Sequence, residues 1–294
     1  MPLQLITGPT AEPISLIEAK THLRQTAITA DDTLIKALVR GARALVEQKT
    51  QRCIMAQRWR LVLDSFPGPT LMGVPFGQAF TLPAHAILLP KAPALQVVSI
   101  TYTAMDGTTQ TLAAGTDYVV DLACEPARIT PPFGKIWPIP LPQIGAVQVT
   151  FDAGCCAPLT ANIGSDQIAI PAWKTLAASD TLRVFNRDVA AVGDGALPAP
   201  LAINTDYYVK TVVSAGVYQL AATAGGALID ITGAGTGENF VGVLPDGMID
   251  WMRLSLATLY ENREAIVMDQ RVTLAQLPFE FIDGLLDPYR LAFY

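Results

Sequence analysis

The stretch that most constrains the fold is Asp246–Met268, DGMIDWMRLSLATLYENREAIVM. Its length predicts a helix of about six turns. Pro245 can open this helix, and Asp246 meets the positive end of the helix dipole. The first half is apolar on most sides, whereas a surface helix carries a single apolar stripe. Several neighbours must therefore enclose it, and the apolar helix surface exceeds what one copy can cover, which implies self-assembly.

Two earlier helices are predicted as partners of this one. Ser15–Glu18 forms a capping box that begins a short helix. Asp31 and Asp32 are predicted to cap a longer helix, to about Arg52, with apolar residues at three-and-four spacing. The positions predicted to build this helical frame and the contacts between subunits are Leu34, Leu38, Leu45, Ile249, Trp251, Met252, Leu256, Leu259 and Tyr260.

The apolar period changes from 3.6 to 2 after Ile54, which predicts β structure. Residues 55–154 are expected to form a small antiparallel β-sandwich or barrel. Asp106-Gly107 predicts a hairpin, and the prolines of Pro131–Pro142 predict an irregular loop that carries Trp137. The predicted strands are Trp59–Leu63, Phe80–Leu89, Leu95–Ala104, Asp117–Leu122 and Ala146–Ala153.

A second β-rich block, 155–243, reads as a self-contained insertion between the first β unit and the last helix. Its predicted strands are Gln167–Pro171, Thr181–Phe185, Tyr207–Val213, Val217–Ala222 and Asn239–Val243.

The predicted fold class is α+β: a helical frame interrupted by an antiparallel β-sandwich or barrel and by a second, inserted β domain. Residues 1–54 hold the N-terminal arm and helices, and 1–13 are expected to be extended and unpacked. Residues 55–154 form the first β domain, 155–243 the inserted module, and 244–294 the long helix and the tail.

Composition excludes several classes of protein. The chain has 294 residues and a net charge of −6, with no run of Lys or Arg, so binding of nucleic acid through phosphate neutralisation is not expected. No apolar run approaches the roughly 20 residues that span a bilayer, and no signal peptide is recognisable. The four cysteines fit no zinc pattern. The sequence therefore favours a soluble cytosolic protein without membrane contact.

No set of residues predicts catalysis, a metal or a cofactor. The two histidines, His22 and His85, do not accompany a nucleophile motif. Gly233–Gly237 resembles part of a phosphate loop, but a strand pattern follows instead of a helix. Tyr207-Tyr208 and Trp173 could form a carbohydrate platform, although the core of a small β unit is the favoured interpretation. We predict that the chain is not an enzyme.

The C-terminus is unusually apolar for a chain end. Its alternation at Tyr289, Leu291 and Phe293 suits a strand added to a partner or a plug for a groove. Packing on the chain's own helices is the open alternative. The candidate partner contacts are Leu285, Leu286, Tyr289, Arg290, Leu291, Phe293 and Tyr294.

An ordered series of segments resembles the head–tail connector (adaptor) proteins of long-tailed bacteriophages and related gene-transfer particles. The series covers roughly 1–154 and 244–294. Its members are Ser15–Arg24, Asp31–Ile54, Gln57–Pro67 (QRWRLVLDSFP), Leu89–Ile100, Tyr102–Leu112 (YTAMDGTTQTL), Trp137-Pro138, Ala146–Gly154, Leu259–Glu264 and Leu285–Arg290.

The resemblance implies a homo-oligomeric ring, typically of twelve copies, in the neck of a virion assembled in the host cytoplasm. Such a ring docks on the portal, extends the DNA channel without binding DNA specifically, and presents a platform to the stopper or tail-completion protein. The C-terminal segment would reach the portal. Residues 155–243 depart from the pattern, being much longer than the usual loop, and would decorate the outside of the ring. The alternative function is a virion protein that binds a glycan or receptor through this module.

Overall fold

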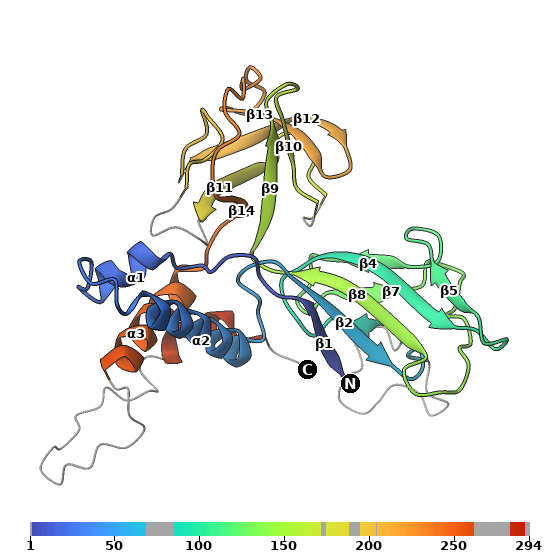
Figure 1. Ribbon diagram of the computed structural model, residues 1–294. Helices are drawn as coiled ribbons and strands as arrows, with labels where there is room; N and C mark the ends of the chain where they lie inside the picture. Colours follow the sequence, from blue (N-terminus) through green and yellow to red (C-terminus); the bar gives the residue numbers. More distant parts are fainter. Residues whose placement is uncertain are drawn as a thin grey trace, which may run out of the picture.

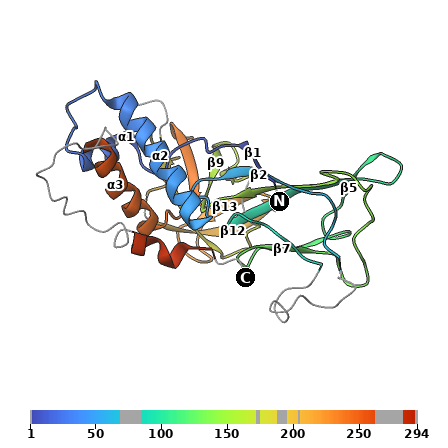
Figure 2. The same cartoon turned by 90° about the horizontal axis from the view of Figure 1, so that it is seen from below.

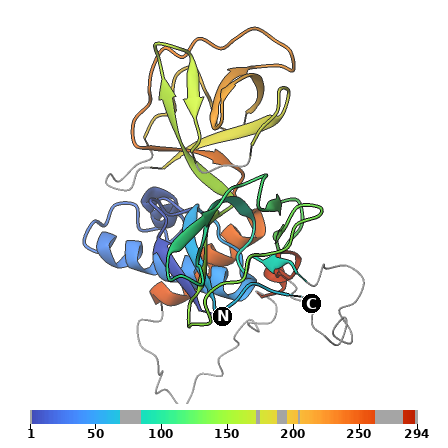
Figure 3. The same cartoon turned by 90° about the vertical axis from the view of Figure 1, so that its right-hand side faces the viewer.

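The computed structural model describes residues 2–68, 85–171, 175–187, 195–203, 205–261 and 283–291. Figure 1 shows three lobes around one junction: the helices, a β unit and a barrel. Figure 2 shows the helices and the β unit side by side from below, and Figure 3 shows the barrel above both of them. The helical elements are α1 (Leu16–His22), α2 (Asp32–Thr50), α3 (Asp246–Glu261) and the 3₁₀ turn η1 (Gly284–Tyr289).

The predicted capping box at α1 is confirmed. The Glu18 N–H donates to Ser15 Oγ (3.2 Å), and the Ser15 N–H donates to Glu18 Oε2 (3.1 Å). The two donors at the helix start are thus satisfied reciprocally.

The predicted capping role of Asp31 is wrong. Asp31 stands at the N-cap of α2 but makes no capping hydrogen bond with its side chain. Its carboxylate instead accepts a hydrogen bond of 2.6 Å from the Tyr260 hydroxyl, because a buried phenol needs a partner. Asp32 pairs with Lys20 across 2.8 Å. Both aspartates therefore join helices rather than cap one.

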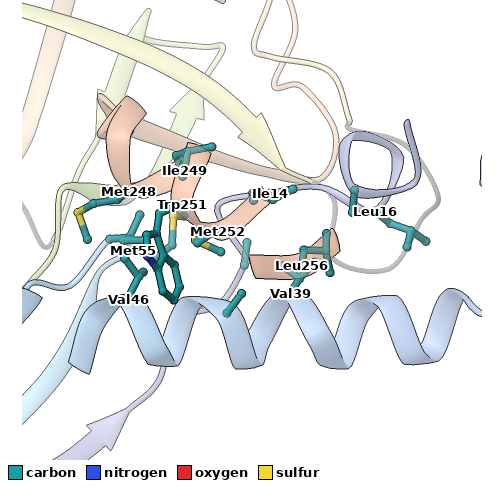
Figure 4. Close-up of a cluster of buried hydrophobic side chains, with 14 of the residues drawn as sticks. Ile14, Leu16, Val39, Val46, Met55, Met248, Ile249, Trp251, Met252 and Leu256 are labelled. Atoms are coloured by element: carbon teal, nitrogen blue, oxygen red, sulfur yellow. The ribbon is translucent and has the colours of Figure 1, made fainter. Parts of the chain in front are cut away.

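The helices α1, α2 and α3 enclose one apolar core, which is drawn in Figure 4. The predicted stripe of α2 is buried through Ile35, Val39 and Val46. α3 runs antiparallel to α2, since Tyr260 near its end meets Asp31 while Trp251 lies under Lys49 (5.4 Å from Nζ to the ring). The predicted last residues of the long helix, 262–268, lie outside the described residues.

The first β unit packs a five-stranded sheet against a three-stranded sheet around one core. The larger sheet has the order β1-β2-β8-β4-β5, with β1 (Leu3–Thr7), β2 (Gln57–Leu63), β4 (Ala94–Thr103), β5 (Thr109–Leu112) and β8 (Val147–Ala153). The smaller has the order β3-β7-β6, with β3 (Ile87–Leu88), β6 (Val119–Asp121) and β7 (Arg128–Thr130).

The N-terminal arm is extended, as predicted, but it is not free. β1 pairs antiparallel with β2, with Leu3 opposite Leu61, and forms the edge of the larger sheet. The predicted hairpin at Asp106-Gly107 is confirmed, with Gly107 at φ +82 between β4 and β5. Half of the predicted strand Phe80–Leu89 lies outside the described residues, and the other half contains β3.

The second β block closes into a six-stranded barrel. Its order is β10-β13-β12-β11-β14-β9, with β9 (Cys156–Asn162), β10 (Gln167–Ala169), β11 (Thr181–Arg187), β12 (Asp206–Ser214), β13 (Val217–Ala221) and β14 (Glu238–Gly242). Closure leaves no strand edge for a foreign chain. The sequence did not predict β9, which contains Pro158 and starts directly after β8.

Backbone hydrogen bonds tie the three lobes together where the chain passes from one to the next. The Cys155 N–H donates to the Ile54 carbonyl (2.9 Å), and the Ala56 N–H donates to the Cys156 carbonyl (2.8 Å). Gly154 lies so close to this crossing that a Cβ there would be 2.7 Å from the Ala56 Cα. Only glycine therefore fits between the two segments.

The buried carboxylate of Glu47 fastens α2 to the same junction. It accepts hydrogen bonds from the Ile54 N–H (2.9 Å), from Gln57 Nε2 (2.8 Å) and from Arg43 Nη1 (2.8 Å). Burial raises the pKa of Glu47 above its ordinary value, while Arg43 acts to lower it. The Glu47 carboxylate thus connects α2 to the start of β2.

The barrel is joined to the helical frame by side-chain contacts as well as by the chain itself. In β14 the side chain of Val241 belongs to the barrel core, while the neighbouring Phe240 belongs to the helical core and is 1% exposed. Phe185 stacks on Phe240 (5.5 Å between ring centroids). Arg187 lies over Phe185 and donates to the Pro13 carbonyl (3.2 Å).

Gly154→Ala is expected to lower the free energy of unfolding by about 3 kcal/mol, the upper end of the cost of overpacking. The new methyl group would overlap backbone atoms that cannot move without breaking the junction. Urea unfolding followed by circular dichroism measures the effect. Gly8→Ala is the matched control, because no atom lies within 4 Å of its Cβ position; equal stability of the two variants would contradict the role of Gly154.

Candidate assembly surfaces

The described residues contain no group of three or more His, Cys, Asp or Glu side chains placed to hold a metal ion. Among them there is also no helix with the length and apolar character to cross a membrane. The features that require explanation are exposed apolar side chains, since contiguous apolar surface commonly marks an interaction site. They occur on all three lobes, and they are most exposed on one loop of the β unit.

Most of the predicted frame residues are used inside the chain. Five of them are buried in the helical core, namely Ile249, Trp251, Met252, Leu256 and Tyr260. Leu34 and Leu38 are half-buried against it. Leu45 and Leu259 remain exposed, at 42% and 37%. Leu254, which the sequence analysis did not single out as a site residue, is exposed to a similar degree.

The described part of the C-terminal segment packs on the chain's own helices. Leu286 is fully buried in the helical core, and the Leu291 N–H donates to the Thr50 carbonyl (3.0 Å). Arg52 Nε donates to the Tyr289 carbonyl (2.6 Å). Leu285 and Arg290 stay exposed, while Phe293 and Tyr294 lie outside the described residues.

Asp283 is the polar anchor of this turn. Its carboxylate accepts hydrogen bonds from Lys49 Nζ (2.5 Å) and from Trp251 Nε1 (2.9 Å), which belong to α2 and α3. The bond from Lys49 lowers the pKa of Asp283. The turn therefore fixes the ends of two helices, and it offers a partner only its outer residues.

The Pro-rich loop carries the most exposed apolar side chains of the described chain. Trp137 points inward, stacks on Phe66 (4.8 Å) and donates from Nε1 to the His85 carbonyl (2.7 Å). The others are exposed: Phe133, Ile136, Ile139 and Ile144, together with Met105 of the adjoining hairpin. A cavity of about 450 Å³ lies beside the loop.

We call Phe133, Ile136, Ile139 and Ile144 the apolar loop. The sequence pattern predicts the loop but not this exposed surface. A usable signal was present: large apolar residues alternate with prolines that exclude them from a sheet, so the chain cannot bury them all.

Two tyrosines belong to the core of the barrel. Tyr207 and Tyr218 are buried, and their hydroxyls accept hydrogen bonds from the N–H groups of Ala202 (2.8 Å) and Leu176 (3.2 Å). Tyr208 is half-buried, and Trp173 lies outside the described residues. The interpretation of Tyr207 as core is confirmed.

No known family and no curated protein matches this chain. Solved structures do. A chain in the neck of an empty gene transfer agent (GTA) particle, computed with C6 symmetry, is 19% identical and has a TM-score of 0.53. A chain in the virion of a native GTA particle is 17% identical, with a TM-score of 0.51. Each match covers 100% of this chain and 97% of the other, so the fold is shared over the whole length.

Leu256→Ala is expected to lower the free energy of unfolding by about 2–5 kcal/mol, because it opens a cavity in the fully buried helical core. Leu254→Ala is the matched control on the same helix. Leu254 is 40% exposed, so its replacement should change stability by about 0.5 kcal/mol or less. Thermal unfolding of both variants checks this, and equal losses would contradict the assignment of the buried face.

The thiols at the junction are expected to resist labelling. Burial raises the pKa of Cys155 to about 12 and that of Cys156 well above its ordinary value. Because the thiolate is the reactive form, both should react slowly with a thiol reagent at ~pH 8 in the native protein and rapidly after denaturation. Peptide mapping of the labelled sites measures this. Rapid native labelling of Cys155 would show that the junction opens.

Proposed function

We propose that this chain is a structural, non-enzymatic protein of the neck of a tailed-phage-like or gene-transfer particle. In the finer form of the proposal it is the head–tail adaptor, a homo-oligomeric ring of about twelve copies between the portal and the stopper or tail. The observation that carries the proposal is the whole-length fold similarity to a chain in the neck of an empty GTA particle. The sequence resemblance to connector proteins supports it independently.

The surface of the chain supports a role in assembly. Exposed apolar residues occur on the helices and on the apolar loop, at separate places on the molecule, so one copy can contact several neighbours. A protein that lines a DNA channel should not bind the DNA tightly. The net charge of −6 suits that requirement, because it repels the DNA phosphates. In this proposal DNA passes through the ring without specific contact.

The outer residues of the C-terminal turn are the proposed portal contacts. Leu285 and Arg290 are exposed while Leu286 anchors the turn in the helical core, so the turn presents them from a fixed base. Leu291 follows the turn and is held by the hydrogen bond from its N–H to the Thr50 carbonyl. The barrel is proposed as the outer decoration of the ring, held in place through Phe240.

Particle mass in solution tests the proposal. The purified protein is measured alone and then mixed with the portal protein of the same particle. The expected result is one large complex with many copies of this chain per portal. A monomer that ignores the portal would overturn the proposal.

A matched pair of variants tests the portal contact. Leu285→Asp with Arg290→Asp should weaken portal binding about tenfold or more without changing the fold, because both side chains are exposed. Leu228→Asp with Lys210→Asp is the control: it changes two exposed barrel residues of the same kinds and should leave binding unchanged. Unchanged binding by the first variant would exclude the turn as the contact.

A further inference from the structure

A small cavity lies between α2 and the segment that leads into α1. Its volume is about 270 Å³, and its apolar lining includes Ile14, Leu16 and Val39 of the helical core. Small-molecule pockets usually have roughly 300–1,000 Å³, so protein side chains are the better occupant of this smaller hollow. Lys36 and Arg40, one turn apart on α2, also line it.

The cavity carries positive charge that the described part of the chain does not neutralise. Glu12, the one carboxylate among the described lining residues, is paired with Arg43 (2.7 Å). Arg187 lines the cavity as well and pairs with Glu18 (3.6 Å). The two cations of α2 have no carboxylate within ion-pair distance among the described residues. We call this hollow the basic cavity.

Met105 and Asp106 form the tip of the hairpin between β4 and β5. Both are exposed, Met105 by 62%. The Asp106 carboxylate accepts hydrogen bonds from the hydroxyl (2.7 Å) and the N–H (2.9 Å) of Thr108, and these bonds lower its pKa. The tip therefore has a defined shape in which an apolar side chain stands next to a negative charge.

A second apolar side chain and a second carboxylate lie beside this tip. The Thr103 N–H donates to the Ala146 carbonyl (2.9 Å), which brings the preceding loop next to the hairpin. In that loop Ile144 is 94% exposed, and the Gly145 N–H donates to Asp64 Oδ1 (2.8 Å). Within the described part of the chain, neither carboxylate at this place is paired with a cation. The name acidic end is used below for Asp64, Met105, Asp106 and Ile144.

The basic cavity and the acidic end cannot meet within one chain. Figures 1 and 2 show α2 and the β4–β5 hairpin at opposite ends of the molecule. A second copy can bring its acidic end to a free basic cavity. Such a contact joins two different surfaces, and it produces a closed ring when its rotation closes.

We propose that the acidic end of one copy docks in the basic cavity of the next, and that this contact joins the subunits of the ring. The inference rests on the proposed function and specifies its subunit contact. Met105 supplies a flexible apolar side chain that adapts to an irregular hollow. Asp64 and Asp106 then face Lys36 and Arg40, and the opposite charges fix the orientation.

Contacts between like surfaces are disfavoured. Two acidic ends would oppose carboxylates, and two basic cavities would oppose cations. Shape acts in the same direction, because a hairpin tip fits a hollow but not another tip. The two surfaces therefore favour a head-to-tail contact over a two-fold dimer.

Charge exchange between the two surfaces tests the proposal. Met105→Lys places a cation against Arg40 of the neighbouring copy, and Arg40→Glu places a carboxylate against Asp106. Each variant alone should assemble at least about tenfold more weakly than the wild type. A chain with both substitutions should recover most of this loss, because every contact then joins opposite charges again.

Analytical ultracentrifugation measures the assembly of each variant, alone and with the portal protein. Met105 and Arg40 are exposed, so circular dichroism should show unchanged folding. Ile163→Lys is the matched control for Met105→Lys, since it changes an exposed apolar residue of another hairpin, between β9 and β10. Lys210→Glu, at an exposed barrel position, is the matched control for Arg40→Glu. Both controls should assemble normally.

The outcomes separate this contact from the ring itself. If both single variants assemble like the wild type, the contact is wrong and the ring remains. If both fail, and the folded chain with both substitutions fails as well, the two surfaces do not face each other. If the wild type forms no oligomer either alone or on the portal, the ring of the proposed function is wrong, and the contact with it.

Discussion

One buried carboxylate, that of Glu47, holds the helices to the β unit, and the orientation of the other lobes depends on it. It accepts hydrogen bonds from the Ile54 N–H, the Gln57 side-chain amide and the Arg43 guanidinium. A buried charge left without such partners costs several kcal/mol, so this geometry is strongly specified once the helix forms. The segment that it fixes, from Ile54 to Gln57, is the one on which the barrel entrance then forms hydrogen bonds.

The three lobes therefore behave as one body with distinct surfaces. The contacts between the lobes are specific: the buried Phe240 joins the barrel to the helices, Asp283 joins the C-terminal turn to two helices, and the backbone of β1 pairs the N-terminal segment with the larger sheet. In the proposed ring, little further loss of conformational entropy would accompany assembly, because folding has already ordered these contacts.

Sequence patterns predicted the local structure well where one physical rule dominated. The capping box of α1, the stripe of α2 and the hairpin at Gly107 follow from spacing alone. Errors arose where a distant residue decided the outcome. Asp31 looked like a cap, but Tyr260, more than two hundred residues away, takes its carboxylate. β1 looked like a free arm because its partner strand begins fifty residues later.

The candidate surfaces were harder to foresee for the same reason. Periodicity identified Leu256 and Leu259 as equally apolar, yet Leu256 is buried and Leu259 is exposed. The burial of each residue depends on which other element of the fold packs against that side of the helix. The apolar loop was missed because its residues were assigned by their prolines rather than by their side chains.

The points where the chain enters and leaves the barrel are neighbours, since Cys156 pairs with Gly242 across β9 and β14. A segment whose two ends already touch can be removed or exchanged in a single genetic event, with a short turn sufficient to bridge the gap. The helices and the first β unit would keep their chain connections, while the contacts of Phe240 with the helical core and of Arg187 with Pro13 would need replacement. The barrel thus has the chain geometry of an exchangeable insertion, since its removal would leave two ends that already lie side by side.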